Sequence, residues 1–253
     1  MKYIMKKSEP SEFAEWKEQE KDNLESCYKR PKEDKPSECA WNNLPSNLPI
    51  NAEEGIIYYS KKQLKGELLD EQGLICAFCT DKLENNHHCT IDHLQPKSEN
   101  PRENTFDYFN LLAVCEGKNP SETPLKGDLR HCNNKKDNNP IEVSPLEPTC
   151  EENFIFDAFG KIYPNPEENE NAANTIEKLG LNSPILVRKR KEEIDRILFP
   201  FTVEFDDNRN IIESIRQITR QEALSILTTI DQRSGNQFKP FCITIKQVLQ
   251  TLI

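Results

Sequence analysis

The sequence lacks a long apolar run, and its hydrophobic content is low. No segment approaches the roughly 20 consecutive apolar residues that a membrane-spanning helix needs. Hydrophobic residues make up 35% of the 253 positions, and the mean hydropathy is -0.78. Residues 1–7 contain lysines but no apolar stretch follows them, unlike a secretory signal peptide. These absences predict a cytoplasmic protein without a membrane association, whose core is small, divided or completed by a partner.

The sequence also lacks the excess of positive charge that is typical of proteins that bind nucleic acid unaided. The formal net charge is -10. Residues 73–140 contain 8 Lys and Arg against 10 Asp and Glu, so this stretch is close to neutral. Phosphate backbones are normally bound through many basic contacts. If this chain acts on nucleic acid, we expect part of its affinity to come from another subunit.

Nine cysteines are present, an odd number. Without a secretory signal, this number favours a reducing compartment, where paired cysteines bind metal more often than they form disulfides. Cys76 and Cys79 present two thiolates from one turn, which is the usual first half of a tetrahedral zinc site. Cys115 and Cys132 would form the second half. We therefore predict a structural Zn²⁺ bound by these four side chains.

Alternatives remain for the cysteines and histidines. The four thiols could be buried free cysteines, which are common. His131 could replace Cys132 on the zinc, and His88 could be a ligand rather than a solvated loop residue. Cys27 and Cys39 flank a proline-rich loop, where a second metal site is not favoured.

Asp92 and His93 lie between the cysteine pairs and are suited to phosphodiester hydrolysis. This reaction needs an activated water and stabilisation of charge on the phosphate. The reference pKa of histidine, about 6.5, suits a general base near neutral pH. Consecutive side chains of a strand point to opposite faces, so Asp92 could hold a cation while His93 faces the water. Taken alone, the pair could equally be a loop aspartate beside a solvated histidine, but its neighbours favour catalysis.

Three further residues could complete the site. Asn110 could hydrogen-bond the backbone across a loop, fix the His93 imidazole or occupy an ordinary turn. Asn133 and Asp137 are four residues apart and share a face if they are helical. With Asp92 they form a set of oxygen ligands, which suits Mg²⁺ or Mn²⁺ better than zinc. Such a cation would polarise a phosphate oxygen and stabilise the leaving group.

The pattern of elements predicts an α+β protein that is mainly helical. Short strands are expected at 89–94 and 111–114, a short helix from Cys132, and a hairpin around Gly160. Residues 25–51, with four prolines, are expected to be a loop. Helices are expected at residues 11–24, 52–72, 167–180, 183–198, 220–232 and 241–252.

Prolines that follow the predicted metal site suggest a domain boundary. We expect an N-terminal helical segment for partner docking (1–73), a metal-binding core (74–140) and a C-terminal hairpin with helices (141–253). A basic stretch that includes Arg188, Lys189, Arg190 and Lys191 is either a solvated helix face or a contact with nucleic acid or a partner.

Together these residues resemble an HNH nuclease. The resemblance rests on Cys76-Ala-Phe-Cys79, Ile91 to Lys97, Tyr108 to Leu112, Cys115 and His131 to Asp137. The opening Met1-Lys2-Tyr3-Ile4, with Lys7, Glu9-Pro10, Phe13 and Trp16-Lys17, is similar to the PtuB family in particular. That family is the HNH effector of Septu-type anti-phage systems, and it also accompanies some retrons.

The resemblance implies a ββα-metal fold with His93 as general base and Asn110 as the orienting residue. It also places a divalent ion at Asp92, Asn133 and Asp137, although many HNH enzymes have histidine at the last two positions. It further implies a PtuA-like ATPase partner that restrains the nuclease until infection. In retron-linked systems a reverse transcriptase with its RNA–DNA product joins the complex.

Two other functions stay open. The chain could cut RNA, such as tRNA, rather than DNA, because an HNH site contacts phosphate and says little about the sugar. It could also be a catalytically inactive zinc adaptor, although such a scaffold would have no need of Asp92, His93 and Asn110.

Overall fold

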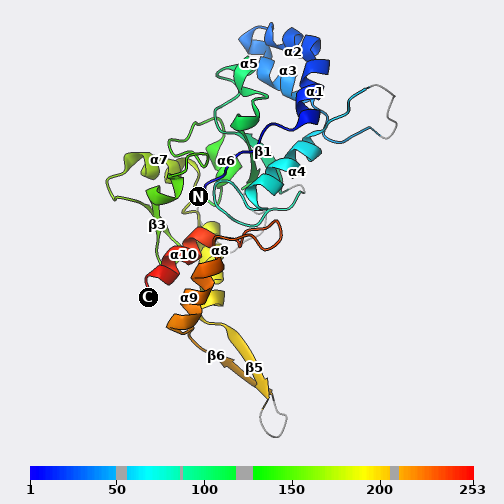
Figure 1. Cartoon of the computed structure of the whole chain (residues 1–253). Helices are drawn as coiled ribbons and strands as arrows, with labels where there is room; N and C mark the ends of the chain where they lie inside the picture. The colour runs from blue at the N-terminus through cyan, green and yellow to red at the C-terminus, as the bar shows by residue number, and fades with distance from the viewer. Residues whose placement is uncertain (50–55, 86–87, 118–127, 206–210) are drawn as a thin grey trace.

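The computed structural model describes residues 1–49, 56–85, 88–117, 128–205 and 211–253. This part of the chain is a mixed α+β structure in which helices predominate and every sheet has two strands. The N-terminal helices form one end of an elongated molecule, and a hairpin projects at the other (Figure 1). The predicted fold class is thereby confirmed as mixed and mainly helical.

The helices are mostly short. They are α1 (Ser11–Gln19), α2 (Lys21–Tyr28), α3 (Pro36–Asn43), α4 (Lys61–Gln72), α5 (Pro101–Asn104), α6 (Cys132–Lys136), α7 (Glu170–Lys178), α8 (Pro184–Leu198), α9 (Arg220–Thr229) and α10 (Cys242–Gln250). Three 3₁₀ turns accompany them, at Lys32–Asp34, Tyr108–Asn110 and Cys150–Asn153.

Three antiparallel strand pairs complete the fold. β1 (Cys89–His93) pairs with β2 (Leu111–Cys115), as predicted, and His93 lies opposite Leu111. β3 (Phe154–Phe156) and β4 (Ile162–Pro164) form the hairpin expected around Gly160. β5 (Phe201–Phe205) and β6 (Ile211–Ile215) form the projecting hairpin, which the sequence analysis did not predict (Figure 1).

The N-terminal region differs from its prediction in three ways. The helix expected at 11–24 is divided into α1 and α2. The loop expected at 25–51 contains α3, because Pro36 occupies the first helical turn, where its fixed φ and missing N–H are tolerated. Cys27 and Cys39 form a disulfide between α2 and α3, contrary to the expectation of metal binding over disulfides.

The helix expected at 52–72 begins late, at Lys61. Ser60 caps it by accepting a hydrogen bond from the Gln63 amide, and the predicted cap Asn51 lies outside the described residues. Gly73 ends it as predicted, with a φ of +66° that glycine adopts without strain. The helices expected at 183–198 and 241–252 match α8 and α10 to within about two residues.

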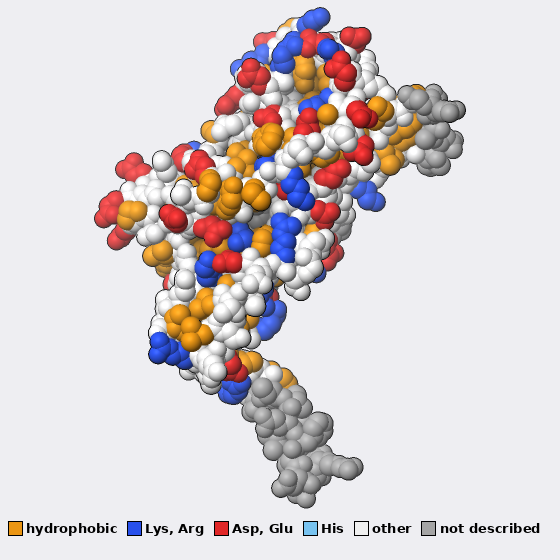
Figure 2. Space-filling model, viewed as in Figure 1, with side chains coloured by type: hydrophobic (Ala, Val, Ile, Leu, Met, Phe, Trp, Pro, Cys, Tyr) orange, Lys and Arg blue, Asp and Glu red, His pale blue; other side chains and the backbone are white. Residues whose placement is uncertain are grey.

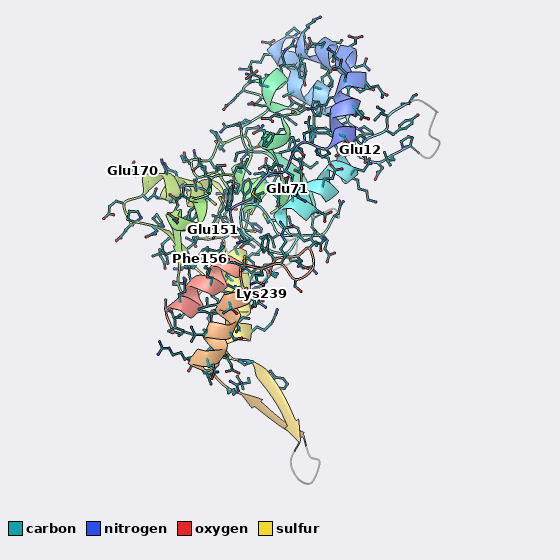
Figure 3. The ribbon with its side chains drawn as sticks, in the orientation of Figure 1. Glu12, Glu71, Glu151, Phe156, Glu170 and Lys239 are labelled. Atoms are coloured by element: carbon teal, nitrogen blue, oxygen red, sulfur yellow. A yellow bond between two sulfur atoms is a disulfide. The ribbon has the colours of Figure 1, made fainter. Side chains whose placement is uncertain are left out.

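The first seven residues thread into the centre of the molecule. Met1 and Ile4 are buried, and the Ile4 amide donates to Pro145 O at 2.8 Å. Lys6 pairs with Glu71 of α4 at 2.9 Å, and the Tyr3 amide donates to Glu151 at 3.0 Å. Figure 3 labels both glutamates near the middle of the ribbon. One hydrophobic cluster thus joins residues between 1 and 186, and a second joins residues between 194 and 249.

The surface carries charges of both signs. Figure 2 shows acidic and basic side chains interspersed over the face that it draws. Within the described part of the chain, no helix combines the length and the apolarity that crossing a bilayer requires.

Candidate active site and metal centre

Four cysteine sulfur atoms converge beside β2. Cys76 and Cys79 come from the turn after α4, Cys115 ends β2 and Cys132 begins α6. All four side chains are buried, and their Sγ atoms lie within 4.8 Å of one another. Sγ atoms are 3.8 Å apart in the pair Cys76–Cys132 and 3.7 Å apart in the pair Cys79–Cys115.

These distances suit zinc. A tetrahedron with Zn–S bonds of about 2.3 Å has ligand atoms roughly 3.8 Å apart. The Cys115 amide donates to the Cys76 sulfur at 3.3 Å, a bond that favours the thiolate. Although burial opposes ionisation, hydrogen bonds from the other three thiols lower the pKa of Cys76 well below its usual value. The predicted four-cysteine site is therefore consistent with structural zinc.

The structure also bears on His131 as an alternative ligand and on a second metal site. His131 is not one of the four converging ligands; its Nδ1 lies 3.5 Å from the Cys115 sulfur. A Cβ on Gly117 would lie 1.7 Å from His131 O, so only glycine fits where the segment after Cys115 passes the residue before Cys132. Among the described residues, no second group of three or more His, Cys, Asp and Glu side chains is close enough to share an ion.

His93 ends β1 and is held in one tautomer. Its Nε2 lies 3.0 Å from the backbone oxygen of Thr105. Because a carbonyl oxygen can only accept, Nε2 carries the hydrogen and Nδ1 is left with a lone pair. The side chain is buried, and its ring meets the edge of Trp41 with ring centroids 4.9 Å apart. Burial, assisted by the charges of Lys97 and Lys136, lowers the pKa of His93 to about 4, so the imidazole is neutral at pH 7.

Asp92 lies on the other face of β1, as its alternation with His93 predicts. Burial raises its pKa to about 6, against the opposing charge of Lys136. Lys136, itself buried, lies 3.5 Å from the carboxylate and donates to His93 O at 2.8 Å. The Oδ2 atom of Asp92 is buried and has no hydrogen-bond partner among the described residues. An unsatisfied buried carboxylate oxygen fits a ligand for a cation.

Asn110 orders the loop between the two strands. Its Oδ1 accepts from the Gln95 amide at 2.7 Å, and its Nδ2 donates to Gln95 O at 3.0 Å and Asn104 O at 2.9 Å. Of the roles considered for Asn110, the structure shows the hydrogen bond to the backbone across the loop. Since Asn104 precedes Thr105, this amide fixes the segment whose carbonyl holds the His93 ring.

The other two predicted oxygen ligands lie on or after α6. Asn133 is half-buried within the helix, and Asp137 is exposed at its C-terminal cap. The Asp137 amide donates to Asn133 O at 3.0 Å, which brings the two backbones together at this helix end. Lys136, between them in sequence, is the residue of α6 that touches Asp92.

The basic stretch on α8 has one buried member, and its other side chains are exposed or half-exposed. Arg190 is buried and donates to Gly160 O and Leu181 O. Lys189, Lys191 and Arg188 form ion pairs with Asp81, Asp195 and Glu192 respectively. Arg190 therefore serves packing, whereas contact of the exposed members with nucleic acid or a partner stays a prediction.

The sequence analysis missed four side chains that surround His93. Trp41 lies against its ring, Thr105 holds its Nε2, and Lys97 and Lys136 contribute positive charge. Trp41 and Thr105 are far from His93 in sequence and carry no motif signal. The two lysines belong to the segments that carried the HNH resemblance, but nothing local indicated that they would be half-buried or buried.

Comparison with known proteins identifies the family of the chain. No family model matches the chain. A curated relative named "Retron Vc95 putative HNH endonuclease", from Vibrio cholerae serotype O1 biovar El Tor, is 31% identical over 145 residues. The match spans 55% of this chain and 67% of the relative. The chain therefore belongs to the HNH endonuclease family. The relative's name places that protein with a retron.

Proposed function

We propose that this chain is a metal-dependent endonuclease that hydrolyses phosphodiester bonds in nucleic acid. The observation that carries the proposal is the state of His93: a neutral imidazole whose Nε2 is held by Thr105 O and whose Nδ1 can accept a proton. The name of the relative supports a nuclease. Under this proposal β1, β2 and α6 form the ββα-metal unit, and the division into segments 1–73, 74–140 and 141–253 stays a prediction.

The chain's own groups account for the proton transfer. Nδ1 of His93 takes a proton from the attacking water, while the Thr105 carbonyl stabilises the imidazolium that forms. Asn110 is a positioning residue, since it acts through the Asn104–Thr105 segment. A divalent Mg²⁺ or Mn²⁺, held by Asp92 with Asn133 and Asp137, would stabilise charge on the phosphate and the leaving oxygen. The unsatisfied Oδ2 of Asp92 supports that ligand assignment.

The biological setting is proposed from resemblance. The relative's association with a retron favours an anti-phage effector that works with a reverse transcriptase and its RNA–DNA product. The PtuB-like opening of the sequence favours control by a PtuA-like ATPase. Both partners agree with a net charge of -10, because a basic partner surface would aid encounter with nucleic acid.

Cleavage by matched variants tests the proposal. The purified chain, alone and with co-expressed partners, is incubated with DNA and RNA in Mg²⁺ or Mn²⁺. We expect cleavage by the wild-type protein and a loss on the order of 10² or more in His93→Ala. His88→Ala, which changes an exposed histidine, is the control and should cut normally. Full activity in His93→Ala would refute the assignment, and a wild-type complex that cuts neither substrate would favour the adaptor alternative.

A further inference from the structure

A groove of about 610 Å³ lies beside β1. Its lining includes Lys61, Lys62 and Lys65 from the first turns of α4, Trp41 from α3, and β1 residues such as Thr90. No described Asp or Glu lines it. In a chain with a net charge of -10, a groove whose charged lining residues are all lysines is a local exception. We call it the Trp41 groove.

Trp41 connects this groove to the candidate general base. Its ring stacks on Phe106, with centroids 5.5 Å apart, and meets His93 edge-on. The ammonium groups of Lys61 and Lys97 both lie over the same indole, 5.1 and 5.5 Å from its centroid. One half-buried aromatic ring thus gathers two cations next to His93.

The two ammonium groups lack a direct anionic contact within the described residues, although the carboxylates of Glu38 and Asp92 act on Lys97 from a longer distance. Neither Lys61 nor Lys97 makes an ion pair or a side-chain hydrogen bond to any described residue. Burial lowers the pKa of both lysines, and the charge of Lys97 lowers that of Lys61 further. Two half-buried like charges that share one ring are costly unless an anion joins them.

The position of Lys61 and Lys62 in α4 also favours a bound anion. They occupy the first turn of α4, where the helix dipole disfavours cations. The backbone N–H groups of this turn are not available to an anion, because Lys61 N donates to Pro45 O and Lys62 N to Ser46 O. An anion in the groove must therefore be bound by the lysine side chains.

We propose that the Trp41 groove holds one strand of nucleic acid, with Lys61 and Lys97 binding a phosphate beside His93. The inference rests on the proposed nuclease function and names the residues that grip its substrate. Lys62 and Lys65 continue the contact with the backbone along α4. The groove recognises the phosphodiester backbone that DNA and RNA share, and it supplies the local positive charge that the whole chain lacks.

Binding is tested with single strands that cannot be cut. Oligothymidylate and oligouridylate of roughly 12 nucleotides are titrated with Ca²⁺ in place of Mg²⁺, over a range of salt. In Lys61→Gln/Lys97→Gln we expect at least about tenfold weaker binding, and a salt slope shallower by roughly 0.7 because one phosphate is no longer neutralised. Lys161→Gln, which removes an exposed charge from the β3–β4 hairpin, should change neither quantity. Unchanged affinity and slope in the double variant overturn the groove.

Fluorescence gives a second measurement that does not depend on removing a lysine. The chain has two tryptophans, and Trp16 is buried while Trp41 lines the groove. In Trp16→Phe the emission comes from Trp41, and we expect it to change when the oligonucleotide is added. In Trp41→Phe the emission comes from Trp16 and should not change. A Trp41 signal that is indifferent to saturating oligonucleotide contradicts the proposal.

Cleavage and binding together separate the two claims. If the wild-type protein cuts but the groove substitutions leave binding unchanged, the groove is wrong and the nuclease stands. If binding depends on the groove but no cation supports cutting, the groove stands and the nuclease falls. If neither activity is seen, both are refuted. Tighter binding of oligothymidylate or of oligouridylate identifies DNA or RNA as the preferred strand.

Discussion

The two sides of the β1–β2–α6 unit differ in how completely the protein satisfies them. On one side, four buried sulfur atoms lie at the spacing of a zinc tetrahedron and are further supported by the Cys115 amide. On the other side, a buried oxygen of Asp92 makes no hydrogen bond to the described residues, and the Lys136 ammonium lies 3.5 Å from it. The cysteine side is built to hold the fold together. The aspartate side stores an unsatisfied group, which is a common property of reactive sites.

This difference has a consequence for mutations. A substitution on the cysteine side should unfold the protein and thereby abolish zinc binding and cleavage. A substitution on the aspartate side should reduce cleavage while the fold stays intact or becomes more stable.

The largest effect is expected from Cys76→Ser. Zinc binding contributes about 10–16 kcal/mol in small zinc domains, so losing a ligand should release the metal and expose the chain to protease. Elemental analysis and limited proteolysis measure both effects. The matched control is Cys89→Ser, which makes the same change at a buried thiol of β1 outside the cluster and should retain zinc. A folded Cys76→Ser protein with a full complement of zinc would refute the four-cysteine site.

Asp92→Asn should separate activity from stability. The pKa of Asp92 is raised to about 6, so the folded state holds its proton more tightly than the unfolded state does. Ionised Asp92 therefore destabilises the fold above about pH 6, and this cost is relieved as the pH falls. We expect Asp92→Asn to lose cleavage by about 10² or more while its free energy of unfolding at pH 7 equals or exceeds that of the wild type.

Urea unfolding and single-turnover cleavage measure the two quantities for Asp92→Asn. Asp34→Asn, at an exposed position of the same residue type, should change neither. A variant of Asp92 that cuts normally, or one that fails to fold, would contradict the comparison between the two sides.

Asn110→Ala should have a moderate effect on both stability and cleavage. The substitution removes three hydrogen bonds of the loop that carries Thr105, which should cost about 2 kcal/mol of stability. Cleavage should fall about tenfold, because His93 remains but is held less firmly. Asn138→Ala, a change of the same residue type at an exposed position, is the control for the same assays. A loss as large as that of His93→Ala would instead indicate that Asn110 touches the substrate or the metal.

The sequence predicted the four-cysteine cluster, and the strand that carries Asp92 and His93, better than the surroundings of these residues. Cys76-x-x-Cys79 and the adjacent Asp92-His93 carry local signals, since spacing on a turn and alternation on a strand fix where such side chains point. Trp41 carries none: it reaches His93 only because α3 forms at Pro36, which proline content alone argued against. Arg190 was predicted as surface charge but is buried, because carbonyl oxygens of Gly160 and Leu181 satisfy it. Long-range partners of this kind cannot be read from local periodicity.

The most direct test of this difference between the cysteine side and the aspartate side is a single metal-exchange measurement. The purified protein is treated with EDTA to remove exchangeable cations, its zinc is quantified, and cleavage is followed before and after Mg²⁺ or Mn²⁺ is added. We predict that about one zinc per chain remains, that cleavage stops, and that Mg²⁺ or Mn²⁺ restores it with no change in zinc content. Cleavage that persists in the zinc-only protein, or that returns only when zinc is supplied, would contradict the account.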